Sequence, residues 1–435
     1  MEDEKIVIIG GGIIGCSTAW MLKRLSPGCK VLILEKSNGV AQECSFQNGG
    51  IFTYSMHSPW NGSSILSKAF KGIRNPNSYY SINPNLFITI DFWVWAWRFF
   101  WNSFSGYDKR DDNIFALAKR TNEIHSYLRH EMISKFDKNF EEYMGNDIGL
   151  VEVYSTIKGF HKGKAKGIKI NNSYNENVHV YSAREPCTKF EPLMSEWSQE
   201  ITGCQKNNTE LFCAHNSYKL SKNLLNLALS QGVLIEYNAD VEAFQIKDNK
   251  IVSIRLINGK EIIGDKFIIC CGVGSREIGK ALGWTPPIWP LKGHTFDLET
   301  SKKLRHSISI EGDFPLLIAN MGDYYRVSGY CEFTTLKDKE ISQEKCDFIY
   351  KTIKDKLNFK DAEIKNFWAC QRPVTVDDLP IIGQFPGLKN AYINAGHGSK
   401  GSILSLGSAE LMAHIVMGKA PLSNPRPFDP RRFWI

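Results

Sequence analysis

Glycines at positions 10, 12 and 15 give the chain the spacing of a turn that binds the pyrophosphate of a dinucleotide. Gly10 would make the tight bend, Gly12 would let the backbone approach the phosphates, and Gly15 would let a helix pack closely on a strand. Ile13 and Ile14 open that helix, whose first N–H groups and positive dipole end suit an anion. Because this spacing alone is weak evidence, the flanking elements must decide.

Two apolar strands flank the turn. Ile6–Ile9 predict a fully buried strand before it, and Val31–Leu34 predict a second strand after the helix. The second strand ends at Glu35 and Lys36, and Glu35 lies about 20 residues past Gly15, where a carboxylate accepts a hydrogen bond from a ribose 2′-OH. The alternative is an ordinary βαβ unit with a glycine-rich turn and a surface Glu35. We favour the dinucleotide site. The bound dinucleotide should lack a 2′-phosphate, because the Glu35 carboxylate would repel one.

Length and charge limit the classes of function. The 435 residues suffice for about two to three domains and a sizeable core. Basic residues number 53 and acidic residues 46, a net charge of +7 that is spread along the chain. This mild excess suits an anionic cofactor or substrate, or a membrane surface, and nothing in it requires nucleic acid.

Cysteine usage and the N-terminus indicate a reducing compartment. The 11 cysteines are an odd number and form no Cys-x-x-Cys pair, so we expect all thiols to be reduced and no metal to be bound. The acidic start Met1–Glu4 leads directly into the first strand, which argues against a signal peptide. We therefore expect a cytoplasmic protein.

Two further motifs resemble a known family. Ser45 is followed by Asn48-Gly49-Gly50 and then by Ser58-Pro59-Trp60; a plain glycine-rich loop would be the alternative. Near the C-terminus, Arg372-Pro-Val-Thr-Val-Asp runs on to Gly383, and a strand then leads to Gly396-His397-Gly398 and Gly401. Together these motifs resemble the D-amino-acid-oxidase-like group of FAD enzymes, and within it the bacterial D-amino acid dehydrogenases. The resemblance covers essentially the whole chain in the same order.

The resemblance implies an α/β fold. A Rossmann-type FAD-binding domain of the two-dinucleotide-fold kind would contain a three-stranded β-meander at about residues 244–263 and comprise residues 1–60, 205–275 and 370–435. An α+β substrate domain with a mixed sheet would comprise 61–204 and 276–369. FAD would be bound by residues of the matching motifs: Gly10, Gly12, Ile13, Ile14, Gly15, Glu35, Lys36, Ser45, Asn48, Gly49, Gly50, Val241, Gly272, Gly396, Gly398 and Gly401.

Two other segments have distinctive compositions. Residues 85–101 are the most aromatic stretch, apolar on both helical faces but too short and charged for a confident transmembrane span. We expect a helix buried against its neighbours, and a peripheral membrane contact is the alternative. Residues 158–176 carry five lysines with glycines and asparagines, which predicts a solvated, mobile surface segment.

The candidate catalytic residues follow from the family's need to hold an amino acid beside the flavin. An arginine binds the substrate carboxylate as a bidentate pair, a geometry that lysine cannot reproduce. By motif, Arg372 is the first candidate and Arg326 the second, and a structural salt bridge is the alternative for each. Tyr325 or Tyr330 could supply a hydroxyl group. We expect His397 to pack and hydrogen-bond near the flavin rather than to act as an acid or base.

The predicted function is FAD-dependent oxidative deamination of D-amino acids to 2-oxo acids and ammonia. Glycine, N-methyl amino acids and 2-hydroxy acids stay open as substrates. A non-catalytic FAD-binding scaffold and an NAD-binding dehydrogenase are the competing hypotheses. The electron acceptor is a quinone or oxygen. Lys400 stands where the dehydrogenases carry an apolar residue, and a cation there could favour oxygen by stabilising superoxide.

Overall fold

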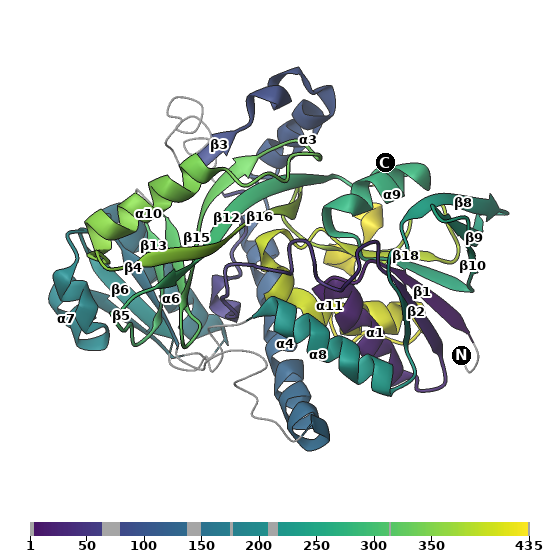
Figure 1. The fold of residues 1–435 in the computed structure, drawn as a ribbon, viewed down its shortest axis with the longest axis horizontal. Coiled ribbons are helices and arrows are strands. Elements are labelled where there is room, and N and C mark those ends of the chain that lie inside the picture. The colour runs from purple at the N-terminus through teal and green to yellow at the C-terminus, as the bar shows by residue number, and fades with distance from the viewer. Residues whose placement is uncertain are drawn as a thin grey trace.

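The computed structural model describes residues 4–62, 79–136, 149–174, 177–207, 216–312 and 315–433. A six-stranded sheet at one end of the molecule contains both strands of the predicted dinucleotide unit (Figure 1). Its strands, in spatial order, are β17 (Ile381–Gln384), β18 (Ala391–Ala395), β11 (Lys266–Ile269), β1 (Lys5–Ile9), β2 (Lys30–Leu34) and β7 (Leu234–Glu236). Only β17 is antiparallel to its neighbour; the other pairings are parallel.

Alternate residues of these strands enter two different cores. Ile6 and Ile8 of β1 face the cluster formed by the helices α1 (Ile13–Leu25), α4 (Tyr107–Phe136), α8 (Ser217–Ser230) and α11 (Gly401–Val416). Val7 and Ile9 face a second cluster on the opposite side of the sheet. Burial on both faces explains why Ile6–Ile9 are all apolar rather than alternating with polar residues.

A three-stranded antiparallel meander contributes to that second cluster. Its strands are β8 (Val241–Lys247), β9 (Lys250–Leu256) and β10 (Glu261–Ile263). The first turn places Asp248 and Asn249 at φ of 52° and 60°, the left-handed pair that a two-residue hairpin turn requires. The predicted meander is therefore confirmed.

A larger mixed sheet lies beside the first. Its path is β16 (Glu363–Thr375), β12 (Ile288–Glu299), β15 (Tyr325–Phe333), β14 (Leu316–Asn320), β13 (Ser307–Glu311), β4 (Leu150–Tyr154), β6 (Gly203–Asn207) and β5 (Val178–Ser182), with β3 (Tyr80–Ile82) beside β15. The helices near it include α6 (Ile157–Tyr174), α7 (Arg184–Phe190) and α10 (Gln343–Leu357) (Figure 1). This α/β architecture with mixed sheets is the predicted fold class.

The proposed domain boundaries fall inside two of these strands. Strand β16 pairs with β12 along almost its whole length and so continues across the boundary at residues 369 and 370. Strand β6 likewise crosses the boundary at 204 and 205. The division into two domains stays a proposal.

The lysine-rich segment is helical over residues 158–174, and its lysines are exposed or half-buried, which agrees with the predicted surface position; its mobility stays a prediction. Helix α6 buries a face formed by Phe160, Gly163, Gly167 and Ile170. A side chain at Gly163 would overlap the ring of Tyr154 on β4, so the glycines serve close packing on the sheet. Residues 175 and 176 lie outside the described part of the chain.

One pair of cysteines departs from the expectation of reduced thiols. Cys187 of α7 and Cys204 of β6 form a disulfide across a Cα–Cα distance of 6.0 Å. The two cysteines are 17 positions apart in the sequence, and only the folding of α7 onto β6 brings them together. The expectation that every cysteine is reduced is wrong for this pair.

The aromatic stretch forms helix α3 (Ile90–Trp101), which is buried on one face only. Phe92, Trp95 and Phe99 pack in a cluster with Trp289 of β12. The opposite face is exposed and continues to Phe104 just past the helix end. We name this surface the α3 outer face; its residues are Ile90, Trp93, Val94, Trp97, Trp101 and Phe104. The prediction of a buried helix is therefore right for one face and wrong for the other. Within the described residues, no helix is long and apolar enough to cross a membrane.

Candidate functional site

A cavity of about 810 Å³ begins at the carboxyl ends of β1, β2 and β11 and extends to β12, β13, β15 and β16 of the larger sheet. Ligands of open α/β sheets bind outside the carboxyl ends of the strands, which is where the predicted glycine-rich turn lies. The cavity is therefore the place to test each candidate residue.

The three glycines of the turn each meet a different constraint. Gly10 has φ of +104°, and a Cβ there would lie 2.7 Å from the carbonyl oxygen of Cys270. A Cβ on Gly15 would overlap the Gly10 carbonyl. A Cβ on Gly12 would meet no protein atom closer than Ser45 Oγ, at 3.6 Å. Gly12 thus has room within the protein, and a side chain there would enter the cavity instead.

The N-terminus of α1 faces the cavity and carries no acidic residue in its first turn. Gly12, Ile13 and Ile14 line the wall, and the Ile13 N–H donates to Ser45 Oγ at 3.2 Å. The positive end of the helix dipole is therefore not offset by a neighbouring carboxylate of that turn. This end of the cavity suits a phosphate group.

Glu35 lies in the same wall and is almost fully buried. Its Oε2 accepts from the Gly11 N–H at 2.7 Å and its Oε1 from the Ser37 N–H at 2.8 Å. Each oxygen can accept a further hydrogen bond, so the carboxylate is held in place and still open to a ligand. Val241, Gly272 and Lys36 line this end too, and Lys36 is paired with Glu43 at 2.8 Å.

The Ser45–Gly50 segment continues the wall. Ser45, Asn48 and Gly49 line the cavity. The Asn48 amide donates to Ser402 Oγ at 2.8 Å and thereby joins the segment to α11. Gly50 does not line the cavity; its φ of +73° and its approach to Ala319 of β14 explain the glycine.

The C-terminal glycine motif forms another part of the wall. His397, Gly398 and Gly401 line the cavity, whereas Gly396 turns away from it at φ of +77°. Burial lowers the pKa of His397 to about 3, so the imidazole is neutral at neutral pH. A neutral, buried ring agrees with a packing role.

Lys400 also lines the cavity but carries no unpaired charge. Its ammonium group lies 2.6 Å from Asp378 Oδ2, and both side chains are buried. The same carboxylate oxygen accepts from the Trp60 N–H at 2.6 Å. The ion pair joins the Ser58–Trp60 motif to the C-terminal motif.

Arg372 projects from β16 into the cavity wall, and its guanidinium covers Gly293 of β12. Its Nη1 donates to Cys331 Sγ at 3.3 Å. No carboxylate of the described residues forms an ion pair with it. The geometry leaves a planar cation available to an anionic ligand.

Arg326, the second candidate, does not line the cavity. Its Nε lies 2.9 Å from Asp297 Oδ1, and its Nη2 donates to the hydroxyl of Tyr324 at 3.2 Å. Arg326 thus forms a salt bridge within the protein, which is the alternative that the sequence analysis gave for this residue. Tyr325 also points elsewhere and donates to the Lys302 carbonyl, whereas Tyr330 reaches the cavity and donates to Ser81 Oγ at 2.8 Å.

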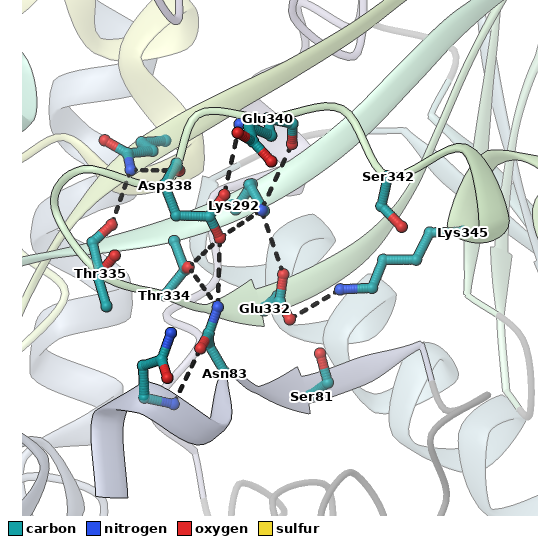
Figure 2. Close-up of polar contacts among 12 residues, drawn as sticks. Ser81, Asn83, Lys292, Glu332, Thr334, Thr335, Asp338, Glu340, Ser342 and Lys345 are labelled. Carbon is teal, nitrogen blue, oxygen red and sulfur yellow. Dashed lines mark hydrogen bonds and ion pairs between the residues drawn. The ribbon is translucent and has the colours of Figure 1, made fainter. Parts of the chain in front are cut away.

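A loop at residues 334–342 closes one side of the cavity. The sequence did not predict the side-chain contacts that hold this loop in place. Gln371 Nε2 donates to the carbonyls of Thr335, Leu336 and Asp338, at 3.0, 3.3 and 2.7 Å. Lys292 lies between Asp338 and Glu332 (Figure 2). Its Nζ is 2.5 Å from the Asp338 carboxylate and 3.5 Å from that of Glu332. Leu336 of this loop lines the cavity.

Other wall residues also escaped prediction because they come from elements far apart in sequence. They include Tyr79, Tyr80, Tyr107, Lys162, Lys166, Cys44, Cys331 and Cys370. The two lysines belong to α6, whose lysines and glycines resembled a solvated loop. Within the described residues, no group of three or more His, Cys, Asp or Glu side chains is arranged to hold a metal ion.

Comparison with known proteins gives a consistent result. The family model described as FAD dependent oxidoreductase (DAO) matches residues 5–415. A D-amino acid dehydrogenase of Vibrio vulnificus is 28% identical over 99% of both chains, and one of Allorhizobium ampelinum is 27% identical over 95% of both.

Solved structures share the fold at lower identity. Glycine oxidase from Geobacillus kaustophilus superposes with a TM-score of 0.77 at 16% identity, covering 99% of both chains. L-Proline dehydrogenase from P. horikoshii gives a TM-score of 0.74 at 18% identity, covering 100% of this chain and 98% of the other. With the family model matching nearly the whole length, the chain belongs to the DAO family of FAD-dependent oxidoreductases, with FAD as its cofactor.

Proposed function

We propose that the protein oxidises D-amino acids to 2-oxo acids and ammonia and that Arg372 holds the substrate carboxylate. The observation that carries this proposal is the Arg372 guanidinium in the cavity wall, with no carboxylate partner among the described residues. The cavity joins it to the glycine-rich turn. The D-amino acid dehydrogenases that resemble the chain over 95–99% of its length support the same substrate class.

The residues at the glycine-rich end fit FAD. Gly12 and the N-terminus of α1 would receive the pyrophosphate, Glu35 would accept from a ribose hydroxyl, and Val241 and Gly272 would border the nucleotide. Gly398 and Gly401 would approach the remainder of the cofactor. Bound FAD supplies an acceptor for the two electrons and the hydrogen that leave the substrate's Cα.

The chain itself has to orient the substrate and exclude water. A bidentate pair with Arg372 fixes the carboxylate, and a fixed carboxylate limits the directions in which Cα–H can point. Leu316, Leu317 and Leu336 supply apolar wall for the side chain. No general base is required if the amino group binds as the neutral amine, which agrees with a neutral His397. Water then hydrolyses the imino acid.

The electron acceptor we propose is a quinone. Lys400 could favour oxygen only as an unpaired cation, and Asp378 at 2.6 Å neutralises it. The α3 outer face offers exposed tryptophans, with Trp97 at 61% and Trp101 at 63% of full exposure. Such an aromatic face suits the interface of a membrane, where a lipid-soluble quinone is found. The proposal thus includes a peripheral membrane contact through α3.

Anaerobic spectroscopy tests the proposed reaction. The purified protein is mixed with D-amino acids, L-amino acids, glycine, N-methyl amino acids and 2-hydroxy acids, and the absorption bands of the bound flavin are followed. We expect bleaching with D-amino acids and formation of 2-oxo acid and ammonia. If only one of the other compound classes bleaches the flavin bands, that class is the substrate class instead of D-amino acids. A flavin spectrum that no compound bleaches would indicate a scaffold rather than an enzyme.

A further inference from the structure

Two thiols from distant parts of the chain meet in the cavity wall. Cys44 lies just before the Ser45–Gly50 segment and Cys370 lies on β16, 326 residues later. The Cys44 thiol donates to Cys370 Sγ at an Sγ–Sγ distance of 3.4 Å. Both residues line the cavity; Cys44 is half-buried and Cys370 is buried. The pair is separate from the Cys187–Cys204 disulfide.

The surroundings make one of the two thiols the better nucleophile. The hydrogen bond from Cys44 and the positive charge of Arg372 lower the pKa of Cys370 to about 7. The same hydrogen bond, together with burial, raises the pKa of Cys44. Near neutral pH Cys370 is therefore the thiol of the pair that ionises more readily, and a thiolate beside a thiol is typical of reactive dithiols. Reactive cysteines lie in electropositive, partly exposed surroundings, and here Arg372 supplies the positive charge and the cavity wall the opening.

We propose that Cys44 and Cys370 are a redox-active dithiol that low-molecular-weight disulfides, such as oxidised glutathione, convert to an intramolecular disulfide. The Cys370 thiolate attacks one sulfur of the oxidant, forms a mixed disulfide and releases one glutathione thiolate. Cys44 then loses its proton and attacks Cys370 Sγ, and the second glutathione thiolate leaves. Two protein thiols are oxidised and one glutathione disulfide is reduced to two thiols.

The new bond would join two functional parts of the wall. A disulfide is about 2.05 Å long, so the two sulfur atoms must approach each other by about 1.4 Å. Cys44 precedes Ser45, which accepts from the Ile13 N–H of α1, and Cys370 lies two residues before Arg372. The cross-link would thus tether the glycine-rich end of the cavity to the strand that carries Arg372. The dithiol chemistry itself does not depend on the proposed substrate.

Thiol trapping on the FAD-loaded protein tests the proposal. The protein is equilibrated with buffers of increasing oxidised-to-reduced glutathione ratio, alkylated with iodoacetamide, digested and examined by mass spectrometry. We expect a peptide pair linked through Cys44 and Cys370 that grows with the ratio and disappears with dithiothreitol. The Cys187–Cys204 peptide pair serves as a reference for a disulfide outside the cavity.

Variants identify the attacking and the resolving thiol. Cys44→Ser should trap Cys370 as a mixed disulfide with glutathione, because the resolving thiol is missing. Cys346→Ser, which alters a buried thiol outside the cavity wall, should leave the Cys44–Cys370 cross-link unchanged. If Cys44→Ser does not fold, the presence or absence of the Cys44–Cys370 cross-link in the wild-type protein tests the proposal by itself. The proposal is overturned if both cysteines stay fully alkylated at every ratio while the flavin spectrum is unchanged, or if Cys370 links to Cys331 instead.

Discussion

Lys400 and Asp378 form a buried ion pair at 2.6 Å in the cavity wall, between the C-terminal glycine motif and Trp60. The resemblance to the dehydrogenases predicted an apolar residue where this chain has Lys400. Because Asp378 compensates its charge, the departure is structural, and the pair fixes two motifs that both border the cavity.

We expect Lys400→Met to destabilise the protein without changing its reactivity toward oxygen. Removing one partner of a buried pair leaves the other charge unpaired, which typically costs about 3–5 kcal/mol of unfolding free energy. Denaturant unfolding measures that loss, and the double variant with Asp378→Asn should lose less than the sum of the two single changes. If Lys400→Met slows reoxidation of the reduced protein by oxygen tenfold or more, the lysine acts on oxygen and the quinone proposal is weakened.

Gly12 provides a test of the nucleotide end of the cavity. The isopropyl group of Gly12→Val would project into the cavity, where the pyrophosphate is expected. We therefore expect a folded protein that purifies without FAD. Glu35→Ala should weaken FAD binding by about 1.5–3 kcal/mol, the contribution of a hydrogen bond to a charged group. Flavin absorbance and titration with free FAD measure both effects, and a Gly12→Val protein with full FAD content would contradict the assignment.

The parts of the fold that sequence could predict are those fixed by local chemistry. Ile6–Ile9 are all β-branched and form a strand, and this composition suits burial on both faces. The glycine-rich turn that begins at Gly10 leads into a helix, and this local pattern does not depend on the rest of the chain. The hairpin at Asp248–Asn249 is likewise set by two residues that tolerate left-handed backbone. Such elements depend little on distant contacts.

The parts that sequence could not predict depend on contacts between distant segments. The sequence ranked Arg372 above Arg326 but left a structural salt bridge open for both. Only the pairing of β12 with β15 brings Asp297 to Arg326. The Cys187–Cys204 bond requires α7 to lie on β6, which cysteine spacing does not reveal. Trp97 and Trp95 are two residues apart in one aromatic run, and their different exposure follows from where β12 lies.

The α3 outer face should bind anionic vesicles. Trp97 and Trp101 expose aromatic rings of the kind that favours the membrane interface, and the net charge of +7 adds attraction to anionic lipids. We expect the protein to sediment with anionic vesicles at low salt and Trp97→Asp to abolish this without loss of FAD. The matched control is Leu422→Asp, because Leu422 is 69% exposed and lies outside the α3 outer face. This variant should sediment like the wild type. Equal sedimentation of the two variants would exclude α3 as the contact.

Arg372 provides the test of the substrate assignment. If its guanidinium holds the substrate carboxylate, Arg372→Ala leaves that carboxylate in the cavity without a partner, a loss of about 3–5 kcal/mol. We therefore expect kcat/KM for D-amino acids to fall by about two to four powers of ten, at about 1.4 kcal/mol per factor of ten. Arg372→Lys should recover only part of this loss, because a point charge cannot present two parallel N–H donors.

Two controls separate the proposed role of Arg372 from a structural one. Amides of the same D-amino acids lack the carboxylate and should lose far less activity in Arg372→Ala, while FAD content stays near that of the wild type. Arg326→Ala breaks the buried pair with Asp297 away from the cavity, so it should lower the unfolding free energy and affect acids and amides alike. If Arg372→Ala instead behaves like Arg326→Ala, with equal losses for acids and amides, the guanidinium supports the wall and the carboxylate is held elsewhere.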